Sequence, residues 1–207
     1  MLSSHQLLRM SNRSGQLKLH HLPVLLLHAS RRIRSLAAGL HSAFLRLAST
    51  RSQIFTYIRD FATSDQAEGI MGAWCMAAHD VDRQTASLAR SSWSDFVILP
   101  LNKDISVKDK LVLDKGLYIP LISLIQRSAL DPAGVHIWLN PPAPAPPPPP
   151  PGAKKGRAPT QVKRVEEDTS RRPEEEEERS EDRSARLRIG ALGALGWVIG
   201  VHLMSVL

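Results

Sequence analysis

A run of prolines in the second half of the chain limits how much of the chain can fold. Nine of the fifteen prolines lie between positions 141 and 151, and six are consecutive: Pro146, Pro147, Pro148, Pro149, Pro150 and Pro151. Proline lacks a backbone N–H and fixes φ, so such a run favours extended polyproline II. Residues 141–172 are therefore predicted to be a disordered, proline-rich and basic linker. A spacer without a partner is the favoured interpretation, and a polyproline-reading protein is the alternative.

The segment after the linker is charged and then apolar. Residues 173–188 carry many charges of both signs and predict a solvated helical stalk. Residues 189–207 carry no formal charge, and as a helix they would extend about 28 Å, close to the roughly 30 Å of a bilayer core. We therefore expect a single transmembrane helix with a thin energetic margin, and a helix docked on a soluble core is the alternative. The anchoring positions are Ile189, Leu192, Leu195, Gly196, Ile199, Gly200, Leu203 and Leu207.

Two glycines of this segment are spaced for close helix packing. Gly196 and Gly200 form a GxxxG pair, which lets two helices approach each other. Weak helix–helix self-association is therefore one predicted interaction, and a contact with the membrane is the other.

The positive charge of the chain lies at its beginning. Residues 1–59 contain nine lysines and arginines and no acidic residue, whereas the net charge of the whole chain is +7. The remainder therefore sums to −2, which argues against a nucleic-acid-binding protein.

This basic block also has the pattern of an amphipathic helix. Leu36, Leu40, Phe44 and Leu47 recur at spacings of four, four and three, which predicts one apolar stripe. A cationic, acid-free, amphipathic segment is typical of a mitochondrial transit peptide, and a cleavage pattern ends at Phe61. Residues 1–61 are therefore interpreted as a targeting segment, with a disordered basic arm as the alternative. The arginines expected to act in targeting are Arg31, Arg32, Arg34, Arg46 and Arg59.

Residues 62–140 are the part of the chain expected to build a core. Residues 68–93 are rich in alanine and methionine and contain no proline, which predicts a helix. Short β-branched apolar runs follow from Phe96 onward, separated by turn-like sequences. This order predicts a small α+β region of one helix and several short strands.

One pair of residues in this region suggests chemistry. Cys75 and His79 are four residues apart and share a face of the predicted helix, which is the geometry for activating a thiol. A lone cysteine is more often a packing residue, and no nucleotide-binding, metal-binding or hydrolase motif occurs in the sequence. We therefore assign no catalytic, cofactor-binding or metal-binding residue, and no cofactor.

Together these features predict a small α+β region flanked by an N-terminal amphipathic basic segment, a stalk and a single C-terminal transmembrane helix. The expected function is that of a non-enzymatic, single-pass interaction or scaffold protein in the mitochondrial membrane, or tail-anchored in another intracellular membrane. A small soluble organellar enzyme or subunit using Cys75 and His79 is one alternative. A reading frame without a settled fold is the other.

Overall fold

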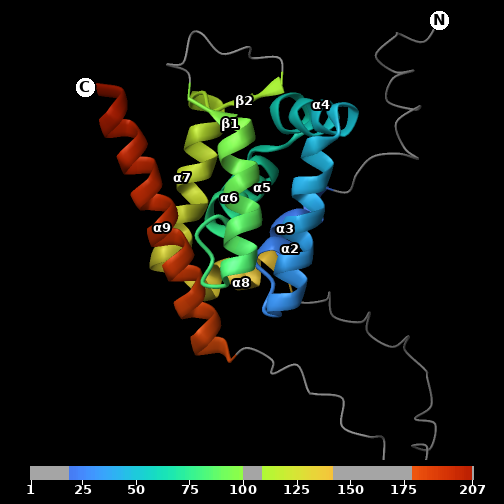
Figure 1. The fold of residues 1–207 in the computed structure, drawn as a ribbon. Helices are drawn as coiled ribbons and strands as arrows, with labels where there is room; N and C mark the ends of the chain where they lie inside the picture. The colour runs from blue at the N-terminus through green and yellow to red at the C-terminus, as the bar shows by residue number, and fades with distance from the viewer. Residues whose placement is uncertain (1–18, 100–108, 142–178, 207) are drawn as a thin grey trace, which may run out of the picture.

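The structure is a computed structural model that describes residues 19–99, 109–141 and 179–206, with side chains up to residue 200 (Figure 1). The elements are η1 (Leu19–His21), α2 (Leu22–Leu26), α3 (Arg31–Arg46), α4 (Ala48–Thr56), η2 (Tyr57–Phe61), α5 (Ser64–Ala77), α6 (Arg83–Phe96), β1 (Val97–Ile98), β2 (Leu111–Val112), α7 (Lys115–Leu130), α8 (Pro132–Leu139) and α9 (Ser180–Val206). The predicted linker and its six consecutive prolines lie outside the described residues.

Helix α5 lies at the centre of the domain. Helices α2, α6, α7 and α9 all pack against it, and its residues from Ala67 to Ala77 are buried on every side. Its first turn is closed by a capping box, because the Thr63 hydroxyl accepts from the backbone N–H of Gln66 while the Gln66 side chain accepts from the N–H of Thr63. A helix without a polar face is stable only when other elements cover it all round.

The predicted α+β fold is wrong, because the described part of the chain is mostly helical. Its two strands have two residues each and pair in parallel, Val97 with Leu111 and Ile98 with Val112. The apolar run that suggested strands after Lys110 forms α7 for most of its length, and the run at 135–139 forms α8. The buried residues of α7 include Leu117, Leu121, Leu124, Ile125 and Ser128, which is a helical spacing. Burial of this stripe outweighs both strand propensity and the interior Pro120.

The predicted transmembrane helix is wrong as well. Among the described residues, no helix combines the length and apolar character needed to cross a bilayer. The described part of the predicted stalk, from Ser180 onward, instead shares one helix with the predicted span, α9, which lies along the domain in Figure 1. Leu187, Ala191, Ala194 and Val198 are buried in the shared core, where α9 packs on α5 and α7. The prediction of a single-pass protein of the mitochondrial or another intracellular membrane is corrected accordingly.

The eight predicted anchoring positions are partly buried, exposed or outside the described side chains. Leu195 packs partly buried against the core, whereas Ile189, Leu192, Gly196, Ile199 and Gly200 are exposed. The side chain of Leu203 and all of Leu207 lie outside the description. Helix α9 therefore corresponds to the alternative of a helix docked on a core, because its inner stripe is buried. Its arginine-rich first turns and four glycines reduce its apolar character.

The basic segment is part of the domain from Leu19 onward. Leu26, Leu45, Ile54 and Phe55 from this segment are fully buried in the shared core. Residues 19–61 therefore do not form an independent leader that packs apart from the rest of the described chain. A role in targeting stays a prediction.

Most of the predicted apolar stripe of α3 faces outward, although Phe44 is partly buried against the core. Leu36, Leu40 and Leu47 are each more than half exposed, while Arg34 and His41 are buried on the opposite side of the helix together with small residues. Periodicity located this helix correctly but assigned its inner face wrongly. The reason is that the buried face consists of alanines, Leu45 and polar side chains, among which Arg34 is paired with Asp80 in the α5–α6 connection.

Helices α5 and α7 cross closely at Gly72, so we expect a single methyl group added there to have a strong effect on stability. A Cβ on Gly72 of α5 would lie 2.5 Å from Cβ of Leu124 on α7. We expect Gly72→Ala to lower the free energy of unfolding by about 1–3 kcal/mol, because the two helices would have to separate. Thermal unfolding of the full chain measures the change.

Gly39→Ala is the matched control for this substitution. Gly39 lies within α3, and the nearest atom to an added Cβ is Cδ1 of Leu88 at 3.7 Å, an ordinary contact. We expect this change to raise the free energy of unfolding by about 0.5–1 kcal/mol, since alanine is the better helix former. Shifts of the melting temperature in the same direction for both variants would contradict the close crossing.

Candidate functional site

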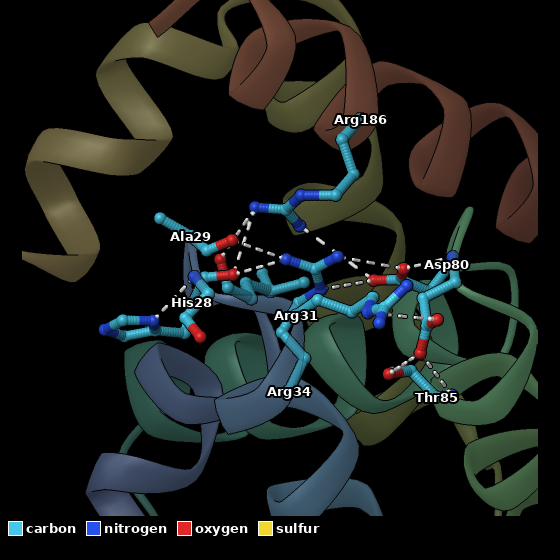
Figure 2. Close-up of polar contacts among 10 residues, drawn as sticks. His28, Ala29, Arg31, Arg34, Asp80, Thr85 and Arg186 are labelled. Atoms are coloured by element: carbon cyan, nitrogen blue, oxygen red, sulfur yellow. Dashed lines mark hydrogen bonds and ion pairs between the residues drawn. The ribbon is translucent and has the colours of Figure 1, made fainter. Parts of the chain in front are cut away.

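Three charged side chains from distant parts of the sequence meet in the interior. Asp80 lies in the connection between α5 and α6, Arg34 lies on α3 and Arg186 lies on α9 (Figure 2). Oδ2 of Asp80 is 3.0 Å from Nε of Arg34 and 4.0 Å from Nη1 of Arg186. All three side chains are only 3–4 % exposed. We call these three residues the ion cluster.

The two arginines of the ion cluster also bind the backbone that follows α2. Nη1 of Arg34 donates to the carbonyls of His28 and Ala29 at 2.9 and 2.8 Å. Nη2 of Arg186 donates to the carbonyls of Leu27 and His28 at 3.2 and 3.3 Å. Cations are favourable at the carboxyl end of a helix, where carbonyls lack intrahelical donors. The ion cluster thereby joins α2, α3, the α5–α6 connection and α9.

Next to the ion cluster, Asp82 begins helix α6. Its Oδ2 accepts from the backbone N–H and the hydroxyl of Thr85 at 2.9 and 2.8 Å, and its own N–H donates to Asp80. Partial burial alone raises the pKa of Asp82. The hydrogen bonds from Thr85 and the charges of Arg31 and Arg34 outweigh burial and hold this pKa below its usual value.

Two histidines lie beside arginines of α9 near the ion cluster. Nη1 of Arg183 is 2.7 Å from Nε2 of His136 on α8, so the neutral imidazole is the form that can accept this hydrogen bond. Burial, followed by the charges of Arg183 and Arg186, lowers the pKa of His136. Burial, followed by Arg183 and other arginines, likewise lowers the pKa of His28. Both rings are therefore held neutral beside arginines of α9.

Cys75 and His79, the two residues predicted to be reactive, have different surroundings. Cys75 is fully buried in α5, and burial raises the pKa of its thiol. A nucleophilic cysteine needs the opposite shift, because the thiolate is the reactive form. His79 is half-buried where α9 passes closely, and a Cβ on Gly193 would lie 2.7 Å from Cβ of His79. Burial, followed by Arg90, lowers the pKa of His79.

The predicted targeting arginines do not form one surface. Arg34 is in the ion cluster, whereas Arg31, Arg32, Arg46 and Arg59 are exposed, and Arg31 lies 3.9 Å from Asp82. The sequence interpretation missed the ion cluster because its members belong to three segments that were assigned to different domains. Nothing in the sequence identifies the two partners of Asp80, which lies inside the single helix predicted for residues 68–93.

The ion cluster has the properties of a structural clamp. Within the described parts of the chain, no three histidine, cysteine, aspartate or glutamate side chains are placed to hold a metal ion. Comparisons with models of protein families, with curated proteins and with solved structures give no match. The class of protein is therefore defined by the fold alone, as a mostly helical domain around a central buried helix.

Proposed function

We propose that the protein is a non-enzymatic assembly module that pairs with a second copy through the outer face of α9. The outer face consists of Ile189, Leu192, Gly196, Ile199 and Gly200. Its three large side chains are half or more exposed. The buried stripe of α9 lies on the opposite side of the helix, so α9 is apolar on both sides. Helices of this kind are normally covered all round, and this is the observation that carries the proposal.

The spacing of the outer face favours another helix as its partner. Ile189, Leu192, Gly196 and Ile199 follow one another at intervals of three, four and three, which is the repeat of a helix–helix seam. A Cβ placed on Gly196 or Gly200 would meet nothing within 4 Å. The face thus has Ile189 and Leu192 at its beginning and Ile199 between two open glycines, and two copies can place large side chains of one over glycines of the other.

Charge supports an antiparallel arrangement of the two helices. The exposed Arg188 lies at the edge of the outer face, near the beginning of α9. In a parallel pair the two Arg188 side chains would lie close together and repel. In an antiparallel pair the two Arg188 side chains would lie at opposite ends of the seam, which removes this repulsion.

The size of the outer face predicts weak association. From Ile189 to Ile199 a helix rises only about 15 Å, so each copy would bury on the order of 300 Å², less than the roughly 800 Å² per partner of a stable interface. We therefore expect a concentration-dependent dimer with a dissociation constant of about 100 μM. The buried, protonated thiol of Cys75 supports the non-enzymatic part of the proposal, since it is the only cysteine in the chain.

Sedimentation of the full chain at concentrations below and above about 100 μM tests the proposal. The wild-type chain should shift from monomer to dimer, and Leu192→Lys should raise the dissociation constant at least about tenfold, because one lysine per copy would be buried in an apolar seam. Leu36→Lys on α3 is the matched control, with 65 % exposure against 60 % for Leu192. A wild-type chain that stays monomeric, or an equal effect of the two lysines, would refute pairing through α9.

A further inference from the structure

A groove with hydrogen-bond donors lies along the outer side of α6. Its volume is about 500 Å³, and its lining includes Arg83, Ser87, Arg90, Ser91 and Ser94. Positions 83, 87, 90 and 94 follow the helical spacing of four, three and four, so α6 presents two guanidinium groups and two hydroxyls on one face. A volume of this size is that of a small-molecule site.

One of the two arginines is held in place before any ligand binds. Nε and Nη2 of Arg90 donate to the carbonyl of Ala78, the C-cap residue of α5, at 3.2 and 3.0 Å. Among the described residues, nothing accepts a hydrogen bond from Nη1 of Arg90. A guanidinium that is already oriented loses little conformational entropy when it binds a second acceptor.

The groove also has a positive local charge. Asp80 contributes to its lining, but the carboxylate of Asp80 is compensated by Arg34 and Arg186 in the ion cluster. Arg83 is exposed and makes no ion pair with any residue that the structure describes. Asp80 therefore does not neutralise the two arginines of α6, whereas the carboxylate of Asp95 lies near the groove and accepts a hydrogen bond from the hydroxyl of Ser91, one of the lining residues.

We propose that this groove binds a small molecule through a phosphate group. Guanidinium groups match the geometry of phosphate oxygens and bind them with short, charge-assisted hydrogen bonds. Serine hydroxyls add neutral donors, since Ser87 lies one helical turn from both Arg83 and Arg90 and Ser94 lies one turn from Arg90. This inference rests on the groove along α6 and is independent of pairing through the outer face of α9.

A nuclear magnetic resonance titration of the full chain with inorganic phosphate tests this site, with chloride at equal ionic strength as the reference. Amide signals of residues 83–94 should shift with phosphate and saturate, with a dissociation constant in the range of about 1–10 mM. In Arg83→Gln the dissociation constant should rise about tenfold, since one charged contact is lost. Arg83 is exposed, so this substitution should leave the fold intact, and an unchanged spectrum outside α6 verifies that.

Arg46→Gln provides the matched control, because Arg46 is an exposed arginine on α3 that does not line the groove. Its dissociation constant for phosphate should equal that of the wild-type chain. Shifts no larger than those caused by chloride, or equal weakening in Arg46→Gln and Arg83→Gln, would overturn the proposal and reveal only a general effect of positive surface charge.

Discussion

Asp80→Asn is expected to lower the free energy of unfolding of the full chain by about 3–5 kcal/mol. The substitution keeps the size of the side chain but leaves Arg34 and Arg186 buried without their shared carboxylate. An uncompensated charge in the interior is among the most destabilising changes known for a single residue. Urea unfolding at neutral pH, followed by circular dichroism, measures the loss.

Asp109→Asn is the control for the ion-cluster prediction. Asp109 also pairs with an arginine, and its Oδ1 lies 2.7 Å from Nη2 of Arg51, but its side chain is 69 % exposed. Solvent screens such a pair, so we expect a loss of at most about 1 kcal/mol. Equal losses in the two variants would mean that burial of the ion cluster does not determine its contribution.

His41 should make stability strongly dependent on pH. Its ring is fully buried, its Nε2 has no hydrogen-bond partner among the described residues, and burial lowers its pKa from 6.5 to about 4. Between these two pKa values the unfolded chain binds a proton that the folded chain does not, so stability falls as the pH falls from 6.5 towards 4. The shift corresponds to a loss of about 3 kcal/mol over that range.

A comparison with His41→Phe isolates this contribution. The ring of His41 makes an edge contact with Trp74, with centroids 4.7 Å apart, and phenylalanine can keep an aromatic contact there. Free energies of unfolding at pH 7 and pH 4.5 are measured for both chains. His28, His79 and His136 are present in both, so their effects cancel in the difference. Parallel pH profiles would show that His41 does not stay neutral in the folded state.

Burial of His41 also illustrates how far helical patterns predict the fold. The sequence predicted a helix over most of α3, which the structure contains, and one helix over residues 68–93, which the structure divides into α5 and α6. It predicted the wrong inner face for α3, because the leucines at 36, 40 and 47 suggested an apolar interior side. A pattern reports which side of a helix is more apolar, but it does not include the polar partners that other helices bring to the less apolar side.

The sequences of α7 and α9 contain the apolar residues that are buried in the structure. The sequence analysis assigned these two segments to strands and to a membrane span instead. The apolar residues of α7 were interpreted as a strand because they form an apolar run with β-branched residues between turn-like sequences, although Pro120 interrupts that run. The apolar residues of α9 were interpreted as a membrane span because length and lack of charge are the local criteria. Both segments form helices that pack against α5, because a helix with this spacing buries its apolar stripe there.

The sequence by itself determined the charge distribution, the helical periodicity of α3 and α9, and the single cysteine as a packing residue. Only the tertiary structure decided that Arg34, Asp80 and Arg186 meet, although 46 residues separate the first pair and 106 the second. Such a cluster forms because each buried charge requires a partner, and packing of α9 against α5 and α7 brings the last partner into place. Local sequence specifies where helices form, whereas pairing of buried charges depends on which helices become neighbours.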